Sequence, residues 1–330
     1  MMESENPRQR IYSGVASATY REPISCPAWI RLDLIIRNGL TQYFEDISGE
    51  KFDELRLFLE SFPNRIRLSY SRNSRLTVSC PVSPCHSNAA AQFIYQGSKF
   101  NVRHGSCGAR PITAGYNQKV QFLNGSRNSG MPDFHFKVFG GTSSNVIGLI
   151  NHRSRSTDQI GSFVQEGLDY ITHTTNVLSV LLVWVDDQDQ PRQVGLLLAE
   201  IRRVAPAVGF GLSYLFQPMV SFGNHALSAD VRNGFVQHTV NRTALSCAGA
   251  AAPITPAGIV GVGFGGPACN AGSIPAYEYA IPGNIVLALD NTGILLAPWH
   301  PAAGAPPLPA GQVPSMVIDL FDIQQAIFDF

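Results

Sequence analysis

The chain has 330 residues, of which 45% are hydrophobic and 15% are charged, and its formal net charge at pH 7 is zero. This composition supplies one large core or two adjoining cores and argues against disorder over most of the chain. The apolar runs are too short to span a bilayer, and the polar start lacks the pattern of a secretory signal. We therefore expect a cytoplasmic protein that does not enter a membrane, or a secreted one whose leader has been removed.

Positive charge is concentrated in the first half of the chain. Residues 1–155 hold 19 Lys and Arg against 11 Asp and Glu, whereas residues 156–330 hold 5 against 13. Four arginines fall in the stretch RIRLSYSRNSR, which also contains Tyr70. A solvated strand face is the simpler interpretation, but the planar arginine side chain also suits phosphate oxygens. The candidate RNA-phosphate contacts are Arg65, Arg67, Arg72 and Arg75.

Most elements predicted in the first half are strands. Apolar residues at helical spacing predict one helix at residues 49–62, which Pro63 ends. Elsewhere, apolar runs and alternating apolar and polar residues predict strands, including a pair on either side of Gly97. These strands cover residues 29–36, 66–71, 75–82, 91–103 and 132–141.

From residue 143 onward the spacing of apolar residues becomes helical. Helices are predicted at residues 143–152, 156–171 and 175–185. A further helix of about 15 residues begins near Asp189 and ends before Pro206. A sheet followed by helices is typical of an α+β domain.

Two charged residues, Glu200 and Arg203, follow an unbroken apolar run in the last of these predicted helices. On a helix they would share one face and lie close together, one turn apart. An ordinary surface ion pair explains this spacing, although such a pair contributes only about 0.2–0.5 kcal/mol. The alternative is a pair half buried on the floor of a pocket, where chemistry uses both charges.

Residues 243–330 contain no Lys or Arg and are rich in Ala, Gly and Pro. We expect them to form a C-terminal region that follows an N-terminal extension (residues 1–29) and the main domain (residues 30–242). The final stretch, residues 315–330, has apolar residues at helical intervals with acidic residues between them. It is expected to be an amphipathic helix that docks back on the protein or binds a partner.

The six cysteines show no spacing of the kind that binds zinc, so no metal is expected. Cys247 and Cys269 bracket a stretch rich in Gly and Ala, which a disulfide would close in a secreted chain. In a reducing cytosol both are free thiols, which is the interpretation we favour. The sequence GVGFGG between them lacks the strand, helix and acidic residue that a dinucleotide site requires, so a flexible loop is expected.

The order of several motifs resembles the ribosome-inactivating protein family, the RNA N-glycosidases typified by the ricin A chain and Shiga toxin A. The stretches RLDLIIRNG, FDELRLFLES and AAAQFIYQGSKF are similar to the early strand, helix and aromatic turn of that family. FKVFGGTSSNVIGLINHRSRSTDQIGSFVQEGLDYI resembles its FGG strand and the helices that follow. LAEIRRV lies at the distance of its SEAARF motif. The similarity spans residues 30–232.

This resemblance implies a ribosome-inactivating-protein-like α+β fold and the removal of one adenine from large-subunit ribosomal RNA. Translation would be inhibited without any metal or organic cofactor. Glu200 would face the oxocarbenium-like ribose, and Arg203 would stabilise the leaving adenine. The residues implied in adenine binding are Tyr95, Phe93, Gly141, Thr142, Ser143 and Asn224.

The chain departs from the family at its stacking aromatics. Thr142 and Ser143 stand where the family has a tyrosine that stacks on adenine, and Asn224 and His225 stand where it has a tryptophan. Because stacking contributes about 1–3 kcal/mol per base, weakened activity is expected. Two alternatives stay open: a non-catalytic RNA- or protein-binding module on the same fold, and an ADP-ribosyltransferase-like toxin that uses Glu278.

Overall fold

A computed structural model describes the chain in separate stretches. These are residues 41–44, 47–48, 50–52, 55, 67–70, 76–79, 84–104, 111–116, 120–122, 129–141, 143–152, 157–187, 193–204, 213–246, 258–289, 294–295 and 313–328. The predicted strand at residues 29–36 lies outside them, as does most of the predicted helix at residues 49–62. Residues 50–52 and 55 are helical, and Phe52 and Leu55 on the predicted apolar face are buried.

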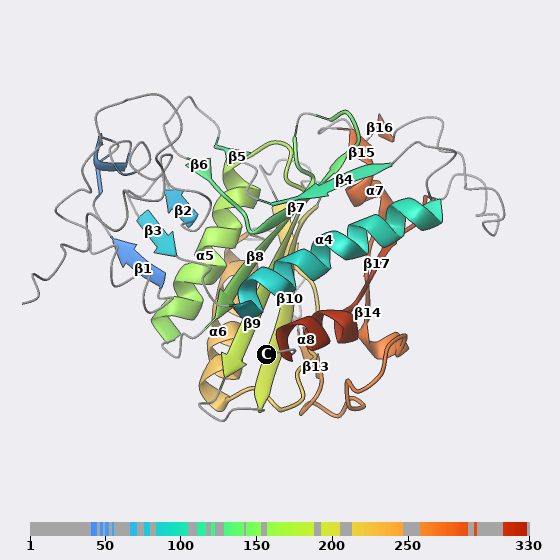
Figure 1. The fold of residues 1–330 in the computed structure, drawn as a ribbon. Coiled ribbons are helices and arrows are strands. Elements are labelled where there is room, and N and C mark those ends of the chain that lie inside the picture. The colour runs from blue at the N-terminus through green and yellow to red at the C-terminus, as the bar shows by residue number, and fades with distance from the viewer. Residues whose placement is uncertain are drawn as a thin grey trace, which may run out of the picture.

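The centre of the fold is an eight-stranded mixed sheet (Figure 1). Its strands are β4 (Ile112–Gly115), β7 (Phe134–Val138), β8 (Val146–His152), β9 (Ser179–Asp187), β10 (Val194–Val204), β11 (Ser213–Phe216), β12 (Met219–Ser221) and β13 (Ile259–Gly261). The order is β13-β12-β10-β9-β8-β7-β4, and β11 also pairs with β10. β8 runs parallel to β9 and β12 parallel to β13, while the other pairs are antiparallel.

Helices cover both faces of this sheet. α5 (Thr157–His173) connects the parallel strands β8 and β9 and packs beside α6 (Ala229–Ser246) on one face. α4 (Pro84–His104) and α8 (Leu320–Phe328) pack together on the other face (Figure 1). The side chains of β10 alternate between the two cores. Leu197 belongs to the core under α5 and α6, whereas Leu196 and Leu198 belong to the core under α4.

A smaller antiparallel sheet lies beside α5 (Figure 1). Its strands, in spatial order, are β1 (Thr41–Phe44), β3 (Leu76–Ser79), β2 (Arg67–Tyr70), β6 (Ser129–Gly130) and β5 (Val120–Gln121). β2, β3 and β7 confirm the strands predicted at residues 66–71, 75–82 and 132–141, and α5 confirms the helix predicted at residues 156–171. The whole is a mixed arrangement of helices and sheet that is compatible with the α+β class.

The described part of the C-terminal region shares the main core instead of forming an appendage. β13 extends the central sheet, and β14 (Glu278–Ile281) pairs with β17 (Met316–Asp319) in a two-stranded sheet. Ile318 and Ile323 pack in the same core as Phe93 of α4, so the final stretch docks back on the protein. The intervening elements are the short helices η1 (Pro275–Tyr277) and α7 (Gly283–Val286) and the strand pair β15 (Ala288–Leu289) and β16 (Ile294–Leu295).

The strand pair predicted around Gly97 is wrong, because these residues form the second half of α4. Ala89, Phe93 and Phe100 recur at helical spacing and are buried on the sheet. Gly97 does not mark a turn. A Cβ atom there would lie only 2.9 Å from the Cβ of Ala114, so the missing side chain lets α4 approach β4 closely.

The helices predicted at residues 143–152, 175–185 and 189–205 are also wrong, because the structure has the strands β8, β9 and β10 at residues 146–152, 179–187 and 194–204. These strands lie in the middle of the sheet, where helices bury both faces. A strand covered on both sides has a continuous apolar run with no alternation, and such a run cannot be distinguished from a buried helix by periodicity. Strands therefore continue through the second half of the chain, with α5 and α6 between them, in place of the predicted succession of sheet and then helices.

Within the described ranges, no helix is long and apolar enough to cross a membrane.

Candidate functional site

The carboxylate of Glu200 lies in the protein interior, on the face of β10 that packs under α4. Its Oε1 atom accepts hydrogen bonds from Ser179 Oγ at 2.7 Å and from Arg202 Nε at 2.9 Å. Its Oε2 atom accepts from a terminal nitrogen of Arg202 at 2.6 Å and from the Tyr279 hydroxyl. Glu200 is 0% exposed. We call Glu200, Arg202, Ser179 and Tyr279 the Glu200 network.

The Glu200 network satisfies its charges internally. Burial would lower the pKa of Arg202, but the hydrogen bonds and charge of Glu200 raise it, so the guanidinium stays protonated. Burial and the Glu200 charge raise the pKa of Tyr279, so its hydroxyl keeps the proton that it donates. A carboxylate held by four donors and closed off from solvent is suited to joining β9, β10 and β14 rather than to contacting a substrate.

Arg203 does not contact Glu200, which corrects the predicted pair. Successive side chains of a strand alternate between its faces, so residues 200 and 203 lie on opposite faces of β10, whereas residues 200 and 202 share one. Arg203 instead donates to the carbonyl oxygens of Ile171 at 2.6 Å, Thr174 at 2.7 Å and Val177 at 3.0 Å. Burial lowers its pKa. Arg203 thus satisfies carbonyl groups at and beyond the last turn of α5, where a helix leaves them without partners.

The residues predicted to bind adenine are dispersed. Phe93 is fully buried and stacks on Phe134 with ring centroids 4.3 Å apart, so it is a core residue. Ser143 accepts a hydrogen bond from Asn176, and Asn224 accepts one from the backbone of Val194. The amide of Gly141 closes a turn on Val138, and Thr142 lies outside the described residues, as do Arg65, Arg72 and Arg75. Arg67 lies on β2, and the structure does not describe its side chain.

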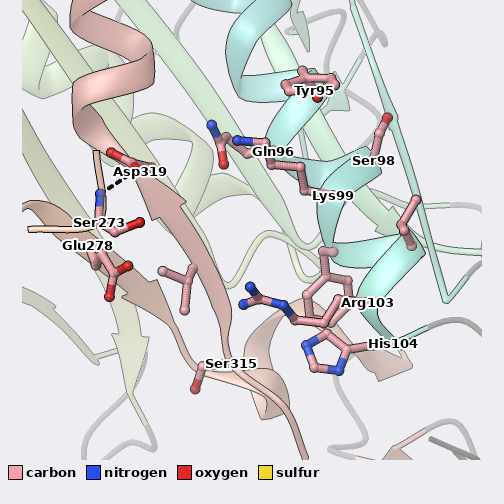
Figure 2. A pocket seen from close by; sticks show the side chains of 13 residues that line it. Tyr95, Gln96, Ser98, Lys99, Arg103, His104, Ser273, Glu278, Ser315 and Asp319 are labelled. Atoms are coloured by element: carbon pink, nitrogen blue, oxygen red, sulfur yellow. Dashed lines mark hydrogen bonds between the residues drawn. The ribbon is translucent and has the colours of Figure 1, made fainter. Parts of the chain in front are cut away.

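Tyr95 is different, because it lines a pocket of about 560 Å³ between α4 and the strand pair β14 and β17 (Figure 2). We call this cavity the α4 pocket. Glu278, the carboxylate of the ADP-ribosyltransferase-like alternative, lines it too. The volume is within the range of sites for small organic ligands. Its lining residues are Tyr95, Gln96, Ser98, Lys99, Phe100, Val102, Arg103, His104, Ser273, Glu278, Ser315, Val317 and Asp319.

One wall of the α4 pocket is a stripe of side chains on α4. Tyr95, Lys99 and Arg103 follow one another at intervals of four residues, which places them on one helix face. Tyr95 is 53% exposed, and the ammonium group of Lys99 lies 5.1 Å from its ring centroid. Arg103 extends from α4 toward the wall that carries Glu278 (Figure 2). This wall therefore offers an accessible aromatic ring and two cations.

Lys99 is already paired, whereas Arg103 is not. Lys99 Nζ lies 2.5 Å from Asp322 Oδ2 on α8, and Gln96 donates to the same oxygen at 3.0 Å. Burial would raise the pKa of Asp322, but these two hydrogen bonds and the Lys99 charge lower it. In the described part of the chain, no hydrogen bond or ion pair engages Arg103. Among the described residues, Arg103 is thus the cation of the pocket whose side chain has no partner. Lys99 contacts both the Tyr95 ring and the Asp322 carboxylate.

The opposite wall is built by β14 and β17. Ser315, just before β17, and Val317 and Asp319 within it alternate with the buried residues Met316 and Ile318. Because of this alternation, one face of the strand lines the pocket while the other packs in the core. The alternation of pocket-lining and buried residues in residues 315–319 therefore forms this wall.

The two carboxylates of this wall differ in their partners. Asp319 lies directly opposite Glu278 in the β14 and β17 register. Its Oδ1 accepts from the amide of Phe321, where it caps α8, and its Oδ2 accepts from the amide of Ser273, each at 3.0 Å. Ser273 has φ of 59°, in the left-handed region, so this contact holds a strained residue. Glu278 is exposed, and its side chain makes no hydrogen bond or ion pair among the residues that the structure describes.

His104 closes the pocket at the C-terminal end of α4. Its ring packs on Phe100 with centroids 4.8 Å apart. Burial lowers the pKa of His104, and the charge of Arg103 lowers it further, so the imidazole is neutral at pH 7. A neutral imidazole can donate one hydrogen bond and accept another.

The residues that line the α4 pocket differ from the set that the sequence analysis predicted as one site. Of the residues predicted to act on adenine, only Tyr95 lies in the α4 pocket, and it is joined by Glu278 from the alternative hypothesis. Lys99, Arg103 and His104 were missed. The signal for Lys99 and Arg103 is the four-residue spacing from Tyr95, which indicates a shared face only when the segment is assigned as a helix.

Two further expectations concern metals and the glycine-rich loop. Across the described residues, no three His, Cys, Asp or Glu side chains come together in a way that could hold a metal ion. Cys269 is a buried free thiol whose pKa burial raises to about 12, and Cys247 lies outside the described residues. Gly261, Gly263 and Gly265 have positive φ, and the carbonyl oxygen of Gly261 accepts from the amides of Phe264 and Gly266. The loop GVGFGG is therefore folded around its own carbonyl oxygen.

Comparison of the sequence with protein-family models gives no match, and the curated proteins include none with significant similarity.

Proposed function

We propose that this protein binds single-stranded RNA in the α4 pocket. Tyr95 stacks on an unpaired base, Arg103 contacts a phosphate group, and Lys99 adds positive charge beside the ring. Proteins that bind single strands combine an accessible aromatic platform with cations that follow the backbone. The observation that carries the proposal is an exposed tyrosine ring in the same cavity as an arginine side chain that has no partner among the described residues.

The surrounding charge supports this assignment. Residues 1–155, which carry a net positive charge, include α4 and the arginine stretch RIRLSYSRNSR. The cations of these segments are expected to attract further RNA phosphates. Stacking tolerates any base, so the proposed function is that of a binding module with modest sequence preference. Its affinity is expected to fall as salt concentration rises, because phosphate contacts release counterions.

Fluorescence anisotropy with a labelled single-stranded RNA tests the proposal. Tyr95→Ala is expected to weaken binding about tenfold, since one stacked base contributes roughly 1–3 kcal/mol, and Tyr95→Phe is expected to retain it. Tyr116→Ala is the matched control, because Tyr116 is 51% exposed and does not line the pocket. Arg103→Ala is expected to weaken binding and to flatten its dependence on salt. Equal losses for Tyr95→Ala and Tyr116→Ala would exclude the pocket as the binding site.

A second candidate function is removal of an adenine from large-subunit ribosomal RNA in the cytosol, on a ribosome-inactivating-protein-like fold. The observation that favours it is the unpaired Glu278 carboxylate in the same cavity as the Tyr95 ring. An adenine stacked on Tyr95 would place its ribose toward that wall, and a carboxylate stabilises an oxocarbenium-like ribose. Glu278 thus becomes a stronger candidate for this chemistry than the buried Glu200.

Incubation of the protein with ribosomes, followed by aniline scission of the rRNA, separates these possibilities. Scission that is lost in Glu278→Gln and kept in Glu200→Gln assigns the carboxylate to the pocket. Scission lost in a folded Glu200→Gln and kept in Glu278→Gln returns the role to Glu200. RNA binding without scission supports the binding module, and transfer of ADP-ribose from NAD that Glu278→Gln abolishes supports the transferase alternative.

A further inference from the structure

The charges of the α4 pocket are divided between its two walls. Arg103 lies on the α4 wall and Glu278 on the β14 wall, and among the described residues neither side chain forms a hydrogen bond or an ion pair. Each group is thus free to contact a ligand that enters between the walls (Figure 2). A ligand that fits both must carry an anionic group for Arg103 and a hydrogen-bond donor for Glu278, because a carboxylate only accepts.

Glu278 is the carboxylate of its wall that can accept such a donor. Both oxygens of Asp319 are occupied by backbone amides, of Phe321 and Ser273. Asp319 also lies directly across from Glu278 in the strand register, so two negative charges face each other there. Like charges opposite each other in a sheet are unfavourable, and a ligand that donates a hydrogen bond to Glu278 relieves this repulsion.

In single-stranded RNA the donors are the ribose 2′-hydroxyl and the exocyclic amino groups of some bases. The 2′-hydroxyl is present at every nucleotide and distinguishes RNA from DNA. Acidic side chains accept hydrogen bonds from ribose hydroxyls in dinucleotide sites as well. With a base on Tyr95 and a phosphate at Arg103, the sugar between them faces the remaining wall, on which Glu278 is the acceptor.

We infer that Glu278 selects ribose over deoxyribose by accepting a hydrogen bond from the 2′-hydroxyl of a nucleotide in the α4 pocket. This inference rests on the proposed RNA binding. DNA lacks the donor, so the Glu278 carboxylate is left unpaired beside the DNA phosphates and repels them. The pocket is therefore specific for RNA through a single carboxylate.

The test compares oligouridine with oligodeoxyuridine of the same length, labelled for fluorescence anisotropy. Uracil has no exocyclic amino group, so the 2′-hydroxyl is the donor that differs between the two probes. The unaltered protein is expected to bind the RNA about tenfold more tightly than the DNA, since a hydrogen bond to a charged group has this magnitude. Glu278→Gln and Glu278→Ala are expected to reduce this ratio toward one, mainly by weakening RNA binding. Glu50→Gln, at an exposed carboxylate outside the pocket, is expected to leave the ratio unchanged.

The outcomes separate the inference from the proposed function. Equal affinity of the unaltered protein for RNA and DNA would overturn ribose selection and leave RNA binding intact. A preference for RNA that persists in both Glu278 variants would assign the selection to another group and overturn the role of Glu278. Failure to bind either probe at low salt would overturn the proposed function and the inference together.

Discussion

A carboxylate, an arginine and a tyrosine come together twice in this protein, with opposite results. The Glu200 network and the α4 pocket contain the same three kinds of side chain. In the network every charged group is bonded to a neighbour and the carboxylate is 0% exposed. In the pocket the arginine and carboxylate side chains have no partner among the described residues, and they lie on opposite walls. The network consists of Glu200, Arg202 and Tyr279 with Ser179, and the pocket has Glu278, Arg103 and Tyr95.

The difference shows that residue type alone does not identify a functional site. A buried carboxylate needs its donors to offset the cost of leaving water, and these donors then occupy the atoms that a substrate would contact. An exposed carboxylate has no such cost and keeps its acceptor atoms for a ligand. The two regions share β14, on which Glu278 faces the pocket and the next residue, Tyr279, contacts Glu200.

The largest expected loss of stability comes from a substitution in the Glu200 network that leaves the residues of the α4 pocket unchanged. Glu200→Gln leaves the Arg202 charge without its counter-ion in a largely buried place, so the free energy of unfolding is expected to fall by about 3 kcal/mol. Glu278→Gln is the matched variant, since the same change at an exposed, unpaired carboxylate is expected to alter stability by less than about 0.5 kcal/mol. Urea denaturation followed by circular dichroism measures both. Similar losses in the two variants would remove the contrast between the regions.

A decrease in pH is also expected to lower the free energy of unfolding through a buried group, His135. Burial, with the charge of Lys137 nearby, lowers the pKa of His135 on β7 from 6.5 to about 4. The unfolded chain then binds the proton at a higher pH than the folded protein does. The free energy of unfolding contributed by His135 is therefore present at pH 8 and decreases as the pH falls from about 6.5 toward 4. The expected loss is about 2 kcal/mol between pH 8 and pH 5.

The measurement of this loss is a series of urea denaturation curves between pH 8 and pH 5. His135→Leu is expected to have a shallower decrease over the same range, because the depressed group is gone. A variant with the same pH dependence as the unaltered protein would contradict the assignment to His135.

A smaller effect distinguishes the two arginines. Arg203→Ala removes three hydrogen bonds to carbonyl oxygens around the end of α5 and is expected to lower the free energy of unfolding by about 1.5 kcal/mol. Arg103→Ala is expected to change it by less than about 0.5 kcal/mol, because nothing in the described structure pairs with Arg103. Hydrogen exchange of the last turn of α5 provides a local readout, with faster exchange expected only in Arg203→Ala. Unchanged exchange there would argue against the capping role.

The elements that could be predicted from the sequence are those whose apolar residues keep a clear spacing. α5 and the strands β2, β3 and β7 carried clear signals of period or turn chemistry. β8, β9 and β10 did not, since helices cover both of their faces and their apolar runs contain no alternation. Because residues 194–204 were predicted as a helix, Glu200 and Arg203 were expected on one face. Residues three positions apart share a face on a helix but lie on opposite faces of a strand.

The α4 pocket was predicted only in fragments. Tyr95 and Glu278 were both singled out, but in separate hypotheses and as parts of separate sites. They are 183 positions apart in the chain, and no local pattern specifies that β14 and β17 pack against α4. Gly97 was predicted as a turn because the local sequence does not show its packing role. That role is the close approach of α4 to Ala114, on a strand that follows later in the sequence. Tertiary packing of this kind leaves little trace in local spacing.

The pocket draws its two walls from distant parts of the chain, and this has a consequence during synthesis. α4 is translated before β14 and β17, which carry Glu278 and Asp319. A nascent chain can display the tyrosine and the cations of α4 long before the acidic wall exists. If Glu278 selects ribose as proposed, a growing chain discriminates between ribose and deoxyribose only after β14 has been made, so α4 alone would contact RNA without this selectivity.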